Sequence, residues 1–131
     1  MSGGGTASKI VGYDLDTTNQ TATIIAESAA ITAVLYTFDI EYADGHLYLV
    51  FSGGLYIYKW NGSSIDFVSL YPNAAGSITA QSITYDGSYL WVATNDVASI
   101  YKVGLDGTSI ATVTFAVPNL CGWAWNGSNI V

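Results

Sequence analysis

Short runs of alternating apolar and polar residues recur along most of the chain. Ile83 to Tyr85 and Ile110 to Phe115 are examples, and Gly, Asn or Asp interrupts such runs roughly every eight to twelve residues. A period of two places successive side chains on opposite faces of a strand, and the interrupting residues favour tight turns. Ala26 to Leu35 is rich in alanine, but its Ile, Thr and Val content suits a loop or strand better than a helical turn. The pattern predicts an all-β chain of antiparallel hairpins.

Two kinds of turn each occur three times. Turns of the first kind follow an apolar alternation and precede an aliphatic run, at Asp44-Gly45, Asp86-Gly87 and Asn126-Gly127. Turns of the second kind follow the matching strands Val11/Tyr13/Leu15, Tyr56/Tyr58/Trp60 and Tyr101/Val103/Leu105, at Asp16-Thr17, Asn61-Gly62 and Asp106-Gly107. The period is about 40 to 45 residues and contains four strands, which is the size of one propeller blade.

The stretch YDGSYLWVA, from Tyr85 to Ala93, adds a family resemblance. The four-stranded unit around it resembles the blades of the β-propeller superfamily, especially divergent bacterial and archaeal repeats with an Asp-Gly-x-x-Leu-Trp-Val motif. The resemblance covers nearly the whole chain and implies a fold but no particular activity. The WD40 signature is missing and the sialidase Asp-box is only partly echoed, by Asp86, Gly87 and Trp91. No active-site residue of a family is therefore carried over.

Blade strands labelled A to D from the central channel outward give one half-propeller domain over residues 1–131. Strands C and D of a split blade lie in 1–28, complete blades in 35–72 and 81–117, and strands A and B of the split blade in 120–131. Joining the end of one chain to the start of another would separate Gly127 from Asp16 by 20 residues. The corresponding steps within the chain are 19 residues, from Gly87 to Asp106, and 16 residues, from Gly45 to Asn61. The junction therefore has the length of an ordinary blade.

Incomplete blades predict self-assembly. A half-blade exposes a sheet edge and an apolar face, which favours pairing with another chain. Three blades are too few to close a ring, since propellers typically have four to eight. Two chains give six, so we expect a homodimer with a head-to-tail contact that closes after two copies. The alternative is that the chain is an excised piece of a longer propeller.

The charge distribution excludes some partners. The chain has no arginine, only Lys9, Lys59 and Lys102 as lysines, and ten acidic residues, which gives a net charge of −7. Binding to nucleic acid or to an anionic membrane is disfavoured because both need a basic surface. No apolar run approaches the roughly 20 residues of a spanning helix, and the start MSGGGTASK lacks the features of a secretory signal. The cellular compartment stays undetermined.

Residues with catalytic or metal-binding chemistry are few. His46 is the one histidine, which excludes a multi-histidine metal site within a chain, and it follows a turn, where a solvated role is favoured. Asp16 and Asp44 occupy turn positions that prefer aspartate for backbone reasons. Cys121 is the one cysteine, so it forms no disulfide within the chain, and a buried structural thiol is favoured over a nucleophile. We expect no cofactor and no metal.

Ten tyrosines and four tryptophans give the one hint of a ligand. Most should pack between blades, but sugar-binding propellers also use aromatic faces against pyranose rings, with Asn and Asp holding hydroxyls. On a propeller the site would lie on the face formed by the D–A and B–C loops, or between blades. The candidates by position are Tyr36, Thr37, Asp39, Tyr71, Asn73, Asn95, Asp96 and Asn119.

These features favour a non-catalytic, self-assembling binding scaffold with a glycan or protein ligand. One alternative is a propeller lyase or hydrolase with a site at the channel mouth, which the lack of arginine and the single histidine disfavour. Another is a structural element of a virus or appendage. A glycan or protein array would distinguish the binding module from both.

Overall fold

The computed structural model describes residues 8–31, 37–51, 54–72, 80–94, 99–114 and 125–130, with the side chains of residues 37, 38, 51, 71 and 72 left out. The described part contains ten strands and no helix, which confirms the all-β prediction. A two-stranded sheet comprises β1 (Val11–Asp16) and β2 (Thr21–Glu27). The first four-stranded sheet has the order β3 (Thr37–Ala43), β4 (His46–Phe51), β5 (Gly54–Trp60), β6 (Ile65–Pro72). The second has the order β7 (Ala80–Tyr85), β8 (Leu90–Thr94), β9 (Ser99–Val103), β10 (Ser109–Thr114).

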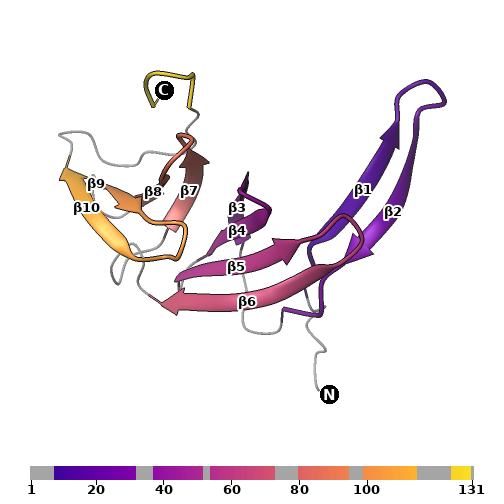
Figure 1. The fold of residues 1–131 in the computed structure, drawn as a ribbon, viewed down its shortest axis with the longest axis horizontal. Coiled ribbons are helices and arrows are strands. Elements are labelled where there is room, and N and C mark those ends of the chain that lie inside the picture. The colour runs from indigo at the N-terminus through magenta and orange to yellow at the C-terminus, as the bar shows by residue number, and fades with distance from the viewer. Residues whose placement is uncertain are drawn as a thin grey trace, which may run out of the picture.

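The three sheets follow one another in chain order (Figure 1). Within each sheet, strands that are neighbours in sequence pair antiparallel, so each four-stranded sheet is a meander. Strand β7 packs against β3 and β4, which brings the first strands of the two larger sheets together. The β1–β2 hairpin lies at one end of the molecule and the second four-stranded sheet at the other, with the 125–130 turn past the end of β7 (Figure 1).

The central strands of the first four-stranded sheet, β4 and β5, are buried on both faces. Tyr48 and Val50 of β4 belong to a core shared with Ile83 and Val92 of the second sheet. Leu49, between them in sequence, points the other way into a core with residues of β2, β5 and β6. Alternation along a strand sends neighbouring side chains to opposite faces, so a strand covered on both sides is apolar throughout. This explains the continuous run from Leu47 to Val50.

Side-chain oxygens close most of the hairpin turns. Asp16, Asn61, Asp86 and Asn126 each accept hydrogen bonds from the backbone N–H groups two and three residues further on, at 2.7–3.0 Å. The turn at Asp44-Gly45 differs, because its two residues both have positive φ, of 48° and 73°. That is the conformation of a two-residue hairpin turn, for which Asp-Gly is preferred. The turns predicted from the sequence are confirmed.

A tyrosine hydroxyl joins the two larger sheets. Tyr48 of β4 is almost fully buried, and its hydroxyl donates a 3.0 Å hydrogen bond to the carbonyl of Leu105, which follows β9. Burial, with a smaller contribution from the Asp44 charge, raises the pKa of Tyr48 to about 12. The hydroxyl therefore stays protonated and able to donate throughout the neutral range.

Replacing Tyr48 with phenylalanine should lower the free energy of unfolding by about 1 kcal/mol at pH 7, since the Leu105 carbonyl loses its donor. The folded-state pKa lies above the unfolded value of about 10, so the tyrosine's stabilisation is complete below pH 10 and is lost as the pH rises towards 12. The variant should therefore lose less stability than the parent between those pH values. Urea unfolding of parent and variant from pH 7 to 11 measures both effects. If the two free energies of unfolding changed in parallel with pH, this role of the Tyr48 hydroxyl would be contradicted.

Strand β1 lies close against the first four-stranded sheet. A Cβ on Gly12 would come within 2.8 Å of the Trp60 ring, so the close approach needs glycine at this position. Main-chain bonds extend the pairing of the two-stranded sheet beyond β1 and β2, from Ser28 N–H to the Ile10 carbonyl at 2.9 Å and from Ile31 N–H to the Ser8 carbonyl at 2.7 Å. Ile31 lies in a core with residues of the four-stranded sheet. The two-stranded sheet is thus anchored at one end, while its turn extends away from the molecule (Figure 1).

Candidate functional site

The loop positions predicted as a ligand site fall largely outside the described residues. This holds for Tyr36, Asn73, Asn95, Asp96 and Asn119, and also for Cys121. Thr37 and Tyr71 lie in β3 and β6, but only their backbone is described. The site proposed at these loops therefore stays a prediction, and Asp39 is its one member whose side chain can be placed.

Asp39 joins the two larger sheets. Its Oδ2 accepts hydrogen bonds from the Ser82 hydroxyl at 2.8 Å and from the Ile83 N–H at 3.0 Å, both on β7. Its Oδ1 accepts a bond from the Ile40 N–H at 2.9 Å. Ser82 is almost fully buried. This carboxylate therefore holds β7 against β3, a role that no local sequence signal reveals because its partners lie more than 40 residues away.

Corresponding positions of the two larger sheets differ sharply in exposure. Tyr42 pairs with Leu47 and Tyr85 pairs with Leu90, each just before the first-kind turn, so Ile40 corresponds to Ile83. Ile83 is 3% exposed, because the first sheet covers it. Ile40 is 45% exposed. Strands β3 and β4 cover Ile83 on β7, but no described strand covers Ile40 on β3 in the same way.

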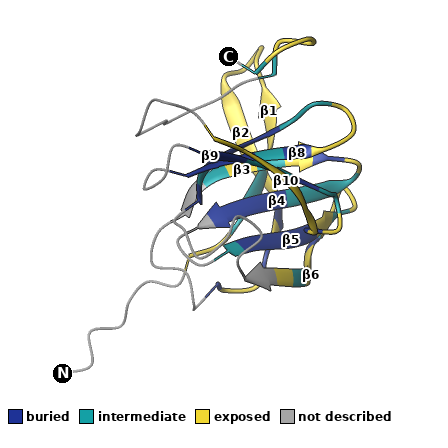
Figure 2. Ribbon diagram, turned by 90° about the vertical axis from the view of Figure 1, so that its left-hand side faces the viewer, coloured by how far each residue is buried: buried dark blue, intermediate teal, exposed yellow. Residues whose placement is uncertain are grey.

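The same contrast holds for the two-stranded sheet. Tyr13 of β1 occupies the position of Tyr58 in β5 and Val103 in β9, two residues before Leu15, Trp60 and Leu105. Tyr58 and Val103 are 4% and 0% exposed, whereas Tyr13 is 53% exposed. Figure 2 shows β1 and β2 exposed along most of their length and β4 and β5 buried. The two-stranded sheet therefore has no third strand and no covering neighbour on this side among the described residues.

A hollow between β1 and the first strands of the four-stranded sheet marks the place. We call it the inner slot; it comprises adjoining cavities of about 220 and 410 Å³. Its walls are mainly apolar, with Ile10 and Val11 on one side and Ile40, Leu47 and Leu49 on the other. No described strand pairs with the edge of β1 that faces away from β2. The slot therefore combines an open strand edge with an apolar wall.

A second hollow, the outer groove, lies between the end of β2 and strands β5 and β6. Its volume is about 460 Å³, and its lining includes Tyr56, Tyr58, Phe67, Glu27 and Asp66. The Phe67 ring meets the Tyr58 and Tyr56 rings edge to face, with centroids 5.6 and 6.0 Å apart. Burial, and to a lesser extent Tyr56, raises the pKa of Tyr58, so the phenol stays neutral. An aromatic wall thus faces two carboxylates.

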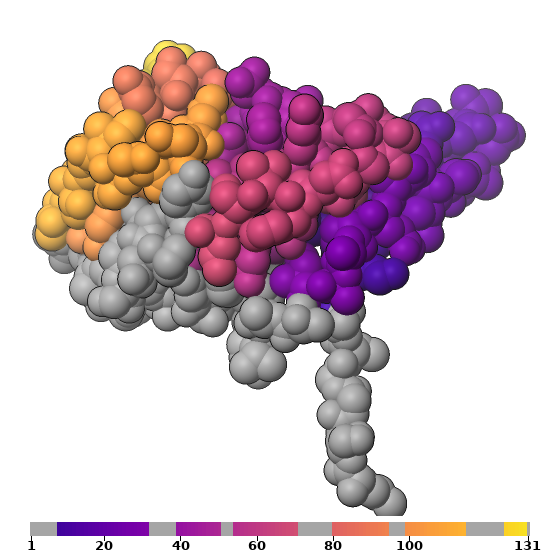
Figure 3. Space-filling model, turned by 60° about the horizontal axis from the view of Figure 1, so that its bottom comes forward, coloured from indigo at the N-terminus to yellow at the C-terminus, as the bar shows by residue number. Residues whose placement is uncertain are grey.

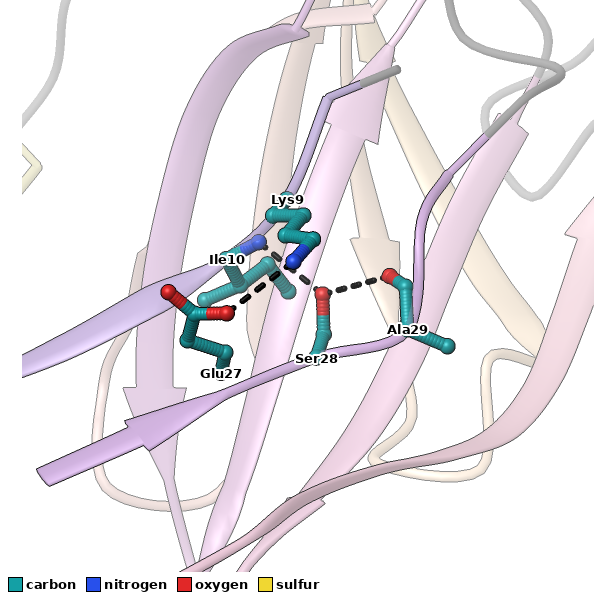
Figure 4. Close-up of polar contacts among 5 residues, drawn as sticks. All are labelled: Lys9, Ile10, Glu27, Ser28 and Ala29. Carbon is teal, nitrogen blue, oxygen red and sulfur yellow. Dashed lines mark hydrogen bonds and ion pairs between the residues drawn. The ribbon is translucent and has the colours of Figure 1, made fainter.

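Residues 9–10 and 27–29, which lie between the inner slot and the outer groove, are held together by polar contacts (Figure 4). The Lys9 Nζ lies 3.0 Å from the Glu27 Oε2, and both side chains are nearly half exposed. The buried Ser28 hydroxyl accepts a bond from the Ile10 N–H at 3.0 Å and donates one to the Ala29 carbonyl at 2.8 Å. An exposed ion pair contributes at most about 1 kcal/mol, so the serine is the stronger fixture. Lys9 also offsets much of the Glu27 charge at the outer groove.

A third hollow of about 370 Å³ contains the one histidine. Asp44, His46 and Asp106 lie in its lining, and the His46 Nδ1 is 2.8 Å from the Asp44 carbonyl oxygen. The described residues contain no group of three or more His, Cys, Asp or Glu side chains that could hold a metal ion. They also contain no helix long and apolar enough to cross a membrane. Apart from the contact of His46 with its own turn, the described side chains of this hollow form no arrangement that indicates a chemical site.

Asp86 links a turn to the tryptophan of the repeat motif. Its Oδ2 accepts a 2.7 Å bond from the Trp91 Nε1–H, and the Lys102 Nζ lies 3.7 Å from the Tyr89 ring centroid and 5.6 Å from that of Trp91. Burial raises the pKa of Asp86, but the Trp91 bond, the turn N–H groups and Lys102 outweigh burial, so the net pKa is lowered. The motif's Asp and Trp therefore serve the fold.

Asp86→Asn should lower the free energy of unfolding by about 1.5 kcal/mol at pH 7, because the amide loses the charged acceptor of Trp91. Asn can still close the turn, as Asn126 does. The folded-state pKa is below the unfolded value of about 3.9, so the aspartate's stabilisation is present above that pH and is lost as the pH falls through it. Urea unfolding at pH 7 and pH 2.5 should show parent and variant converging in acid. Asp106→Asn, at a turn without such a tryptophan bond, is the control and should change stability less.

The chain matches no protein-family model and no curated protein. Its own repeat and the geometry of its sheets remain the basis for any inference about its function. Two features stand out within the described residues: the inner slot beside the open edge of β1, and the outer groove with its aromatic wall.

Proposed function

We propose that this chain is a non-catalytic binding scaffold of the β-propeller type, completed by a second copy of itself. In this proposal the three sheets are blades, and two copies form one six-bladed ring. The observation that carries it is the exposure of Ile40 and Tyr13 at positions whose counterparts Ile83, Tyr58 and Val103 are buried. When equivalent positions of a repeat are buried in one unit and exposed in another, the exposed unit lacks the neighbouring unit that would cover it.

Burial energy supports completion over an open chain. Fully burying a side chain such as Ile or Tyr stabilises by roughly 1.5–3 kcal/mol, and several exposed apolar side chains lie at this end. They are Tyr13, Leu15, Ile24, Ile25, Ile40 and Tyr42. An open strand edge beside such a surface favours pairing with another chain. In a closed ring of two copies the head-to-tail contact occurs twice, so the exposed apolar surface of each copy is covered by the other copy.

The side-chain carboxylates support a scaffold over an enzyme. Asp16, Asp86 and Asp106 accept hydrogen bonds from turn N–H groups, and Asp39 joins two sheets. Carboxylates committed in this way position the backbone and are poorly placed to exchange protons with a substrate. The propeller-enzyme reading is therefore the weaker one.

Thermal unfolding at several protein concentrations tests this proposal. If each copy completes the other, folding is coupled to association and the melting temperature must rise with concentration. We expect a rise of several degrees between about 1 and 100 µM. A melting temperature independent of concentration would instead support a monomer, as for an excised piece of a longer propeller.

The outer groove favours a neutral carbohydrate as the ligand of this scaffold. Aromatic side chains bind the apolar faces of pyranose rings, and carboxylates accept hydrogen bonds from sugar hydroxyls. Here the exposed Phe67 ring supplies the aromatic surface, with Tyr58 packed against it, and Glu27 and Asp66 supply the acceptors. Glu27 is paired with Lys9, and Asp66 accepts a 2.6 Å bond from the Ser64 hydroxyl, so both carboxylates are already oriented.

Phe67→Ala should weaken oligosaccharide binding at least tenfold, because it removes the exposed ring of the aromatic wall. Phe67 is 56% exposed, so the change should affect stability little. Val68→Ala, at an equally exposed neighbour on the same strand, is the control and should bind as the parent does. Calorimetric titration with a panel of neutral oligosaccharides measures the effect. Binding that survives in Phe67→Ala would place the ligand elsewhere, with the predicted loops as the next candidates.

A further inference from the structure

The 125–130 turn has the right form to add to β1 at the border of the inner slot. We infer that it adds to the open edge of β1 in a second copy, with Ile130 opposite Tyr13; this rests on the proposed two-copy scaffold. The mixed blade would then take its inner strands from one chain and β1 and β2 from the other.

The turn matches the first hairpin turn of the second sheet in detail. Trp125 and Ile130 form an antiparallel bridge, as Tyr85 and Leu90 do. The Asn126 N–H bonds to the Asn129 carbonyl at 3.1 Å, and the Asp86 N–H bonds to the Tyr89 carbonyl at the same distance. The segment therefore has the geometry of the turn between the first two strands of a sheet.

The register follows from the complete sheets. Leu47 pairs with Tyr58 between β4 and β5, and Leu90 pairs with Val103 between β8 and β9. Ile130 occupies the position of Leu90, since each is the first paired residue after its turn, and Leu47 corresponds to Leu90 because it pairs with Tyr42 as Leu90 pairs with Tyr85. Tyr13 occupies the position of Tyr58 and Val103. A sheet built in the same way places Ile130 opposite Tyr13.

The turn and the slot lie too far apart to meet within one chain. Figures 1 and 3 show the 125–130 turn beside the second four-stranded sheet and the β1–β2 hairpin beyond the far side of the first. A second copy, placed head to tail, brings the turn of each chain to the slot of the other. Both contacts then form together, as a closed ring requires.

The chemistry of the two surfaces agrees. Residues 125–130, WNGSNI, carry no charge, and the slot is walled mainly by Ile10, Val11, Ile40 and Leu47. An uncharged segment can enter an apolar slot without burying an unpaired charge, which would be costly. The net charge of −7 per chain therefore does not oppose the contact locally.

Disulfide trapping between two different chains tests the register. All variants carry Cys121→Ser, which removes the one native thiol. Chains with Tyr13→Cys are mixed with chains with Ile130→Cys, so no disulfide between the two sites can form within a chain. A disulfide needs Cα atoms within about 7 Å, so the directly opposed pair should cross-link under mild oxidation. Leu15→Cys mixed with Ile130→Cys is the matched control and should cross-link at least tenfold less.

The outcomes separate the register from the two-copy scaffold. A two-chain product from the 13/130 pair, and little from 15/130, supports the inference. A two-chain mass without a 13/130 cross-link overturns the register and leaves the scaffold standing. A one-chain mass without any cross-link overturns both.

In the unmodified protein, hydrogen exchange should slow at 11–16 and 125–130 as the protein concentration rises, and it should stay unchanged at 109–114. Unchanged exchange at the first two segments would contradict the inference.

Discussion

Replacing Asp39 with alanine is expected to lower the free energy of unfolding by about 3 kcal/mol. The change removes the acceptor of the Ser82 hydroxyl and the Ile83 N–H at the contact between β3 and β7. A buried donor left without an acceptor costs roughly 1–3 kcal/mol, and bonds to a charged group lie at the upper end. Urea unfolding followed by tryptophan fluorescence measures the loss.

Asp39→Asn should have a smaller effect, because its remaining carbonyl oxygen can still accept from Ser82. Asp14→Ala, at an exposed acid on β1, is the control and should change stability by less than about 0.5 kcal/mol. If Asp39→Ala proved as stable as the parent, the carboxylate would be dispensable for joining the sheets. Its predicted role at a ligand site would then become the stronger reading.

Ile40→Asp is expected to weaken self-assembly at least 100-fold while leaving the isolated chain almost unchanged. Ile40 is 45% exposed in one chain, so substitution there costs it little. In the proposed ring, however, the carboxylate would be buried beside Leu47 and Leu49 in both slots, and burying an unpaired charge costs several kcal/mol. A hundredfold change corresponds to about 2.8 kcal/mol. Sedimentation velocity over a dilution series measures the dissociation constant.

Ile110→Asp makes the same change on β10, where the isoleucine is 51% exposed and lies outside the proposed contact. It should associate as the parent does. Equal association by Ile40→Asp and the parent would exclude β3 from the interface. Weakening by both variants alike would point to a charge effect without a defined contact.

The strands and turns could be predicted because their signals are local. Alternation along Ile83 to Tyr85 marks a strand, and Asp86 or Asn61 before glycine marks a turn whose geometry the side chain itself stabilises. The grouping into four-stranded units followed from the spacing of these turns. The closure of a propeller ring is a longer-range property, and it stays a prediction.

The candidate sites were less predictable because they depend on which surfaces meet. Ile40 and Ile83 read identically in the sequence, yet one is exposed and the other buried. Tyr56 and Tyr58 lie in a core and also line the outer groove, which the pattern of apolar positions did not distinguish. Asp39 reads as a strand-end acid, whereas its partners come from another sheet. Such contacts join residues far apart in the chain, which single-sequence patterns do not encode.

Light scattering coupled to size-exclusion chromatography measures directly whether two chains form one particle. We expect a single species with twice the 13.8 kDa mass of one chain at micromolar concentration. The Ile40→Asp variant should shift towards the single-chain mass under the same conditions. A parent protein that elutes as a monodisperse 13.8 kDa monomer up to about 100 µM would contradict completion of the split sheet by a second copy.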